Sequence, residues 1–242
     1  MRRTMLTALL SLCMAALPTT GFAQQDTRPG LAVLPFENGG SYGKNRDDYE
    51  ALRKGIAGLI ISELHQQNVR VVDRAETNRI LDEQALATAG RVDAATAARV
   101  GQLVGARYMI TGTFIELYGD FRIDARIIDV ETGEILKTVR SDPDLKDIKD
   151  LDRIITSVAT RILAESPLPA LPSSNPSSGT GASMEGEQVP TEALILYSRA
   201  LLYEDDGKVS KAIEFYQKAL DQFPSFPEAQ EGLKKAKNSQ AG

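Results

Sequence analysis

The sequence predicts an α/β fold in which a mixed sheet is packed against helices, followed by a small α-helical hairpin at the C-terminal end. Short apolar or alternating segments are typical of strands, and longer segments with apolar residues three or four positions apart are typical of helices. A stretch rich in Pro, Ser and Gly separates the two parts, as expected of a linker. Together these observations indicate two folded parts of unequal size.

Residues 1–23 have the pattern of a secretory signal peptide. Two arginines precede an apolar run from Met5 to Leu17, and Ala23 marks the expected cleavage position. The run is shorter than the roughly 20 residues that a membrane-spanning helix needs. We therefore expect export to the periplasm, with an association with the outer membrane left open.

The single cysteine, Cys13, lies inside this signal segment, so the mature chain would contain no disulfide. Lipid attachment at Cys13 is the alternative, but Leu12 stands where a lipidated cysteine usually has a small neighbour. We expect no lipoprotein and no membrane-spanning segment in the mature chain. The net charge of −5 argues against nucleic acid as a partner, because the phosphate backbone attracts basic proteins.

Residues 30–165 alternate strand and helix patterns. The expected elements are strands over 31–36 and 69–72, helices over 47–66, 75–89 and 93–104, strands over 108–117, 121–130 and 134–140, and a helix over 147–164. Asp93 has the place of an N-cap and Gly105 that of a helix stop. The last three strands are joined by short turns and so form a meander.

The middle strand of this meander alternates apolar and charged side chains. Its apolar positions are Phe121, Ile123, Ala125 and Ile127, and its charged positions are Arg122, Asp124 and Arg126. One face of the sheet is therefore expected to pack, while the other faces solvent or a partner. The apolar stripe of the helix over 147–164 is expected to cover the packed face.

Residues 166–190 contain five prolines among serines and glycines and are expected to be a linker. Residues 191–238 resemble one tetratricopeptide repeat followed by a capping helix. The resemblance is carried by Leu196, Ala200, Tyr203, Gly207, Ala212, Tyr216, Ala219 and Pro224, while Arg199 stands where a leucine is usual. Because such repeats bury their faces by stacking, we expect the module to pack on the main domain, on another subunit or on a partner. A marginal hairpin without a partner is the alternative.

The repeat resemblance also implies a binding face, since the first helix of such a repeat lines the concave surface. Carried over position by position, this face would consist of Leu194, Tyr197, Leu201, Glu204 and Asp205. Tyr197 would offer a large contact area, and the two carboxylates would select a basic peptide. We expect these residues to bind a partner protein.

The segments LAVLPFEN at 31–38, YMITGTFIEL at 108–117 and RIIDVETGEIL at 126–136 resemble the CsgG family, the curli production assembly/transport component. Channel-forming members carry two long insertions that build a membrane barrel. In this chain the corresponding connections, 118–120 and 141–149, are too short for a membrane strand of about 9 to 11 residues.

The resemblance therefore implies a non-channel relative: an envelope assembly or accessory protein that contacts envelope or outer-membrane proteins and that can form a homo-oligomer. We expect docking or self-association through the sheet edge and the meander. The alternative is a subunit of a CsgG-like secretion complex whose pore is supplied by another chain.

No pattern in the sequence indicates an enzyme, a metal site or a cofactor site. The loop GGSYGK at 39–44 lacks the glycine spacing of a phosphate-binding loop, and Asn45 replaces its hydroxyl residue. His65 is the single histidine, and the acidic run over 142–152 lacks calcium-loop spacing. We expect no catalytic residue and no cofactor.

Overall fold

The structure, a computed structural model, describes residues 29–40, 46–83, 92–165 and 188–241. Several sequence predictions fall outside these residues. They are the signal peptide with Cys13, most of the linker, the end of the GGSYGK loop, and the second half of the helix expected over 75–89.

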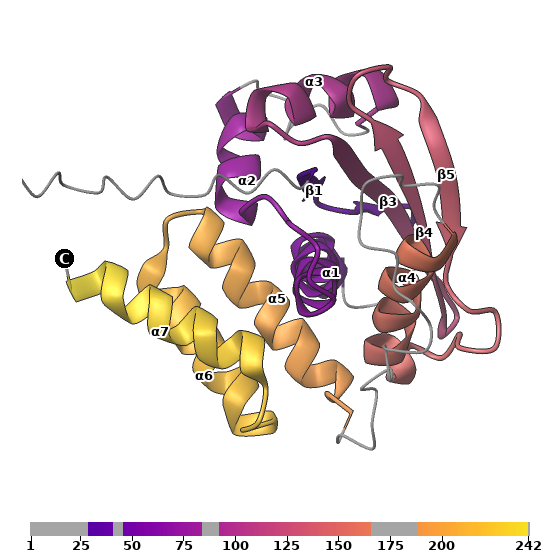
Figure 1. Ribbon diagram of the computed structural model, residues 1–242. Helices are drawn as coiled ribbons and strands as arrows, with labels where there is room; N and C mark the ends of the chain where they lie inside the picture. The colour runs from indigo at the N-terminus through magenta and orange to yellow at the C-terminus, as the bar shows by residue number, and fades with distance from the viewer. Residues whose placement is uncertain (1–28, 41–45, 84–91, 166–187, 242) are drawn as a thin grey trace, which may run out of the picture.

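A mixed sheet of five strands organises the larger part of the chain (Figure 1). The strands are β1 (Leu31–Val33), β2 (Glu37–Asn38), β3 (Tyr108–Leu117), β4 (Asp120–Asp129) and β5 (Ile135–Arg140). Their order is β1-β3-β4-β5, with β2 also paired to β3. β1 and β2 run parallel to β3, whereas β3, β4 and β5 form the expected antiparallel meander.

Two expected strands differ in the structure. The strand expected over 31–36 ends as β1 at Val33, because Pro35 has no N–H to donate and the N–H of Phe36 bonds to the carbonyl of Arg53 instead of the sheet. β2 begins after it, at Glu37. The prediction of a strand over 69–72 was wrong. This segment is reduced to an isolated bridge between Val71 and Leu31, beside which the chain turns into a helix.

The helices begin and end largely where the sequence predicted. They are α1 (Arg46–Gln66), α2 (Arg74–Glu83), α3 (Ala94–Val104), the short 3-10 helix η1 (Ile148–Asp150), α4 (Leu151–Glu165), α5 (Thr191–Asp205), α6 (Val209–Gln222) and α7 (Pro227–Ala241). The expected caps of α3 are confirmed: the Asp93 side chain accepts a hydrogen bond from the Thr96 N–H, and Gly105 adopts the left-handed conformation that ends the helix.

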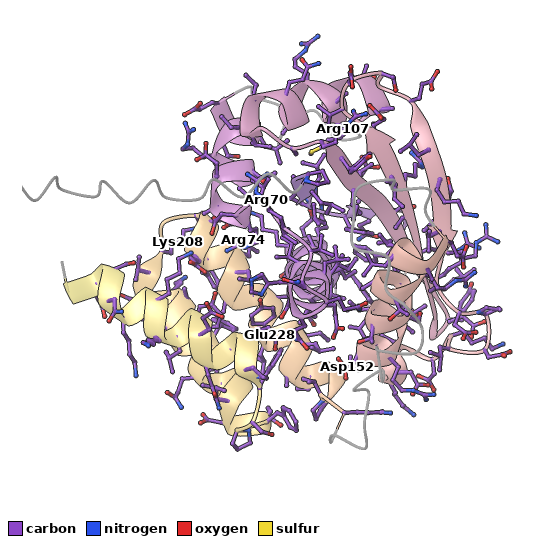
Figure 2. All side chains as sticks on the ribbon, viewed as in Figure 1. Arg70, Arg74, Arg107, Asp152, Lys208 and Glu228 are labelled. Atoms are coloured by element: carbon purple, nitrogen blue, oxygen red, sulfur yellow. The ribbon has the colours of Figure 1, made fainter. Side chains whose placement is uncertain are left out.

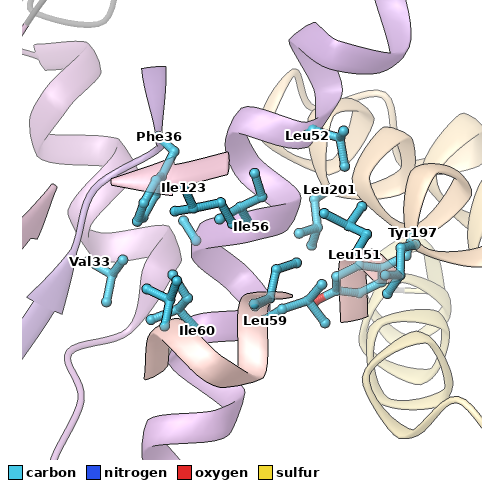
Figure 3. Packing of buried hydrophobic residues seen from close by; sticks show 14 of the residues in the cluster. Val33, Phe36, Leu52, Ile56, Leu59, Ile60, Ile123, Leu151, Tyr197 and Leu201 are labelled. Atoms are coloured by element: carbon cyan, nitrogen blue, oxygen red, sulfur yellow. The ribbon is translucent and has the colours of Figure 1, made fainter. Parts of the chain in front are cut away.

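Helices cover both faces of the sheet. α1 and α4 lie on one face, where Ile56 and Ile60 of α1 belong to the same buried cluster as Val33 and Ile123 of the sheet (Figure 3). α2 and α3 cover the other face near β1, over Met109 and other buried side chains. The alternation along β4 is confirmed, since its four predicted apolar residues are all buried.

The C-terminal helices form an additional layer. α5 and α6 make a helical hairpin, α7 packs on α6, and α5 crosses α1 on the side away from the sheet (Figure 1). α1 is thus enclosed between the sheet and α5. The buried residues of the hairpin and of the α/β part belong to one continuous cluster. The tetratricopeptide assignment of the hairpin stays a prediction.

Candidate functional site

The residues predicted to bind a partner lie on the side of α5 that faces α1. Leu194, Tyr197 and Leu201 are 0%, 6% and 4% exposed. Figure 3 shows Tyr197 and Leu201 beside Leu52 and Leu59 of α1. In the structure, this face of the hairpin is therefore covered by the chain's own α1, which is one of the three packing arrangements the sequence left open. Binding of a partner by these residues stays a prediction.

Two glycines of α1 allow α5 to approach closely. A Cβ atom on Gly58 would lie 3.0 Å from Leu201 Cδ1 and 3.3 Å from the Tyr197 hydroxyl. A Cβ atom on Gly55 would overlap the side chain of Ser198. The spacing of these two glycines in a long helix is the sequence signal for this interface, which was not predicted.

Tyr197 is the centre of an aromatic cluster inside the hairpin. Its ring centroid lies 6.0 Å from that of Tyr216 and 5.1 Å from that of Phe226. Burial raises the pKa of the Tyr197 hydroxyl, so this group is neutral at any physiological pH. The ring joins α5 to α6 and to the start of α7 while its other side contacts α1.

The carboxylate of Asp205, at the end of α5, is held by three side chains of the α/β part. It accepts hydrogen bonds from Lys54 Nζ at 2.6 Å, from an amino group of Arg74 at 2.6 Å and from Asn78 Nδ2 at 2.9 Å. Its side chain is only 9% exposed. Burial lowers the pKa of Arg74, but the Asp205 and Glu204 carboxylates outweigh this and raise it overall.

Glu204 extends this ion network to α6 and α7. Its carboxylate accepts a hydrogen bond from the Tyr216 hydroxyl at 2.6 Å and lies 3.4 Å from Arg74 and 3.7 Å from Lys235. The two carboxylates expected to bind a basic partner peptide thus form ion pairs here with cations of the same chain. Figure 2 shows Arg74 at this junction between α2 and the end of α5.

Arg199, the residue that departs from the repeat pattern, forms an ion pair with Asp48 of α1. Its guanidinium also lies 5.8 Å from the centroid of the Phe215 ring of α6. A leucine at this position would make neither contact. The departure from the pattern is therefore explained by the packing of α5 on α1.

A group of carboxylates lies at the other end of the hairpin. Glu63 of α1 and Asp152 of α4 both have a raised pKa, chiefly because burial disfavours their charged forms. Nearby, Glu228 of α7 accepts a hydrogen bond from Ser62 Oγ at 2.5 Å. The N–H of Val189 donates to Asp152 at 3.3 Å, which ties the start of the hairpin to α4.

The meander leaves a polar face and a hairpin tip exposed. The charged residues of β4 lie on the face opposite to α1 and α4, and Arg140 of β5 shares that face through its pairing with Asp124. At the tip, Tyr118 is 96% exposed and Leu117 is 45% exposed. The Ile148 N–H donates to the Gly119 carbonyl, and the Phe121 N–H donates to the Lys146 carbonyl. These backbone hydrogen bonds join the tip to the segment that follows β5.

The residues considered for enzymatic or metal chemistry lie at exposed or helix-capping positions. His65 is exposed at the end of α1, and Asp147 caps η1 by accepting a hydrogen bond from the Lys149 N–H. Within the described part of the chain, no three His, Cys, Asp or Glu side chains are grouped so as to hold a metal ion. Over the same residues, no helix is long and apolar enough to cross a membrane.

Comparison with known families identifies a match in the N-terminal portion of the chain. Residues 19–122 match the family model described as curli production assembly/transport component CsgG. The match runs from before β1 to the start of β4 and therefore supports a CsgG-like domain in this part of the chain. No curated protein matches the sequence significantly.

Several solved structures are similar to parts of the chain. The LpoB C-terminal domain from Salmonella enterica is 18% identical, with a TM-score of 0.33, and the match covers 49% of this chain and 84% of that one. Lipoprotein GNA1162 from Neisseria meningitidis is 17% identical, with a TM-score of 0.35, and the match covers 55% and 97%. The PelC dodecamer from Paraburkholderia phytofirmans is 14% identical, with a TM-score of 0.33, and the match covers 56% of this chain and 85% of that one. Identities and TM-scores this low carry no argument about function.

Proposed function

We propose that this chain is an exported accessory protein of the bacterial cell envelope, which acts without enzymatic chemistry by binding other envelope proteins. The observation that carries the proposal is the match of residues 19–122 to the CsgG family model. The N-terminal signal pattern supports export to the periplasm, where such a protein would meet envelope or outer-membrane proteins.

The connections of the meander argue for an accessory role and not for a channel. β3 ends at Leu117 and β4 begins at Asp120, so two residues join them, and β5 is followed by a short segment that leads into η1. Neither connection has the length of a membrane hairpin, whose strands need about 9 to 11 residues each. Since the surface of the meander is exposed, it is available for protein contacts, including contacts with a second copy.

The experiment is affinity capture from chemically crosslinked envelopes, with mass spectrometry of the bound proteins. The tagged full-length chain should be processed after Ala23, fractionate with the periplasm, and retain envelope proteins that a tagged, exported control protein does not. Recovery of the unprocessed chain in the cytoplasm, or no specific protein after crosslinking, would contradict the proposal. Leakage of dye from liposomes on addition of the purified protein would contradict the argument from the short connections.

A further inference from the structure

The outer edge of β5 has no strand paired to it within the described residues. The Ser141 N–H donates to the Ile123 carbonyl at 2.8 Å, and the Ile123 N–H donates to Ser141 Oγ at 3.2 Å, so the backbones of these two residues face each other. Bonded pairs recur at every second residue, which places Val139 in the next one. Thr138 and Arg140 therefore direct their backbone N–H and C=O groups away from β4, toward the open edge.

The sheet face next to this edge is cationic. Arg122 and Arg126 of β4 and Arg140 of β5 lie on it, with Asp124 as the carboxylate between them. Asp124 accepts from Nε of Arg122 at 3.1 Å and from Nε of Arg140 at 2.8 Å. Both contacts use Nε, so the terminal amino groups of the two guanidinium groups are left for a further acceptor.

Arg126 adds a third cation to this face. Among the described residues, no carboxylate lies within ion-pair distance of its guanidinium. On β4 and β5, three arginines and one aspartate thus meet on this face, and its next carboxylate, Glu37, lies two strands away on β2, in a chain whose net charge is −5. This local charge favours an acidic occupant and disfavours a basic one.

The spacing of the charges follows the repeat of an extended chain. Arg122, Asp124 and Arg126 are two residues apart along β4, which corresponds to steps of about 6.6 to 6.8 Å. A peptide in the extended conformation with carboxylates at every second position has the same repeat. The edge also offers main-chain donors and acceptors at the repeat of a strand, which an extended peptide backbone matches.

We propose that the outer edge of β5 binds an extended acidic segment of a partner protein. The segment pairs its backbone with Thr138 and Arg140 and places alternate carboxylates on the arginine-bearing face, beside Arg140 and within reach of the long side chain of Arg126. This inference rests on the proposed function, because it names the chemistry of the partner that an accessory protein of this kind would recognise.

The first test uses fluorescence anisotropy with the purified full chain and a labelled octapeptide in which Glu and Val alternate. Saturable binding of the Glu and Val peptide is expected, and the matching Gln and Val peptide should bind at least about tenfold more weakly. High salt should also weaken binding of the Glu and Val peptide. A peptide N-methylated on the backbone groups that would pair with β5 should bind poorly. Equal binding of the Glu and Gln peptides would overturn the proposal, and so would unchanged binding of the N-methylated peptide.

The second test uses variants of the protein. Arg126→Gln and Arg140→Gln should each weaken binding by about three- to tenfold. Arg153→Gln, which changes an exposed arginine of α4 on the opposite face of the sheet, should leave it unchanged. Thr138→Pro removes an outward N–H without removing a ladder bond and should abolish backbone pairing. If the two arginine variants behave like the Arg153 control, the proposal fails.

A vesicle assay separates the proposal from a lipid surface. Binding of phosphatidylglycerol vesicles that is lost in Arg126→Gln and Arg140→Gln, together with no binding of the acidic peptide, would overturn the proposal in favour of an anionic membrane. The outcome is also separable from the proposed function. Crosslinked envelopes that still yield specific proteins while the peptide fails would leave the accessory role standing and remove only the acidic segment.

Discussion

Replacement of Tyr197 by alanine tests the packing of α5 on α1. The ring is 6% exposed, and it contacts Tyr216 and Phe226 within the hairpin. Removal of a buried aromatic side chain costs about 3 to 5 kcal/mol, of which each lost aromatic pair accounts for about 0.5 to 1.5 kcal/mol. We therefore expect Tyr197→Ala to lower the free energy of unfolding by about 4 kcal/mol.

The assay is thermal and urea unfolding followed by circular dichroism. For a chain of this size, about 1 kcal/mol corresponds to 2 to 4 °C in Tm, so the expected decrease is roughly 8 to 16 °C. Because α1 shares its buried cluster with the hairpin, the whole protein should unfold earlier in one transition. Tyr203→Ala is the matched control, since Tyr203 lies on α5 like Tyr197 but is only half-buried, against Phe215 of α6. Its replacement should lower the free energy of unfolding by less than half as much.

Two results would refute this reasoning. An equal loss of stability in Tyr197→Ala and Tyr203→Ala would mean that Tyr197 is not buried against α1. Two separate unfolding transitions, of which Tyr197→Ala shifts only the smaller, would mean that the hairpin folds independently across the linker. The second result would also restore the α5 face as a surface that a partner could occupy.

Three further predictions concern the same interface. Asp205→Asn should lower the free energy of unfolding in urea by about 2 to 4 kcal/mol, because it removes a nearly buried carboxylate that pairs with two partly buried cations, whereas the exposed Asp206→Asn should have almost no effect. Glu63→Gln should raise Tm at pH 7, because burial raises the pKa of Glu63 above its ordinary value of 4.5 and the charged form therefore opposes folding above that raised pKa. The gain in Tm should disappear as the pH falls below about 4.5, where the carboxyl is neutral in both the folded and the unfolded chain. An unchanged gain at pH 4 would contradict this prediction. Ala212→Glu places an unpaired charge at a fully buried position and should destabilise the whole chain and not the hairpin alone, which limited proteolysis of both parts would detect.

The sequence predicted those elements whose patterns are long and locally bounded. β3 has the predicted bounds of 108–117, and α3 is closed by the predicted caps at Asp93 and Gly105. Both depend on interactions within or next to the element. The expected strand over 69–72 failed because a short apolar run becomes a strand only where a neighbour pairs with several of its residues, and here Val71 alone meets Leu31.

The candidate site was predictable in its residues but not in its surroundings. The repeat pattern located a continuous face on α5, and the sequence allowed that face to meet the main domain, a subunit or a partner. Which of these it meets depends on surfaces far apart in the chain, such as Gly55 and Gly58 on α1 and Arg74 on α2. No local pattern connects these residues with residues more than 100 positions later.

The sequence by itself determined the alternation of strands and helices, the meander with its charged face, the short connections and the hairpin after the linker, because each depends on residues close together in the chain. Only the tertiary structure decided that α5 packs on α1, that Asp205 and Glu204 are held by Lys54 and Arg74 of the same chain, and that β5 is an edge strand of the sheet formed by the described residues. The physical reason is that burial, ion pairing and strand order depend on how distant surfaces fit together, and that fit is a property of the folded chain as a whole.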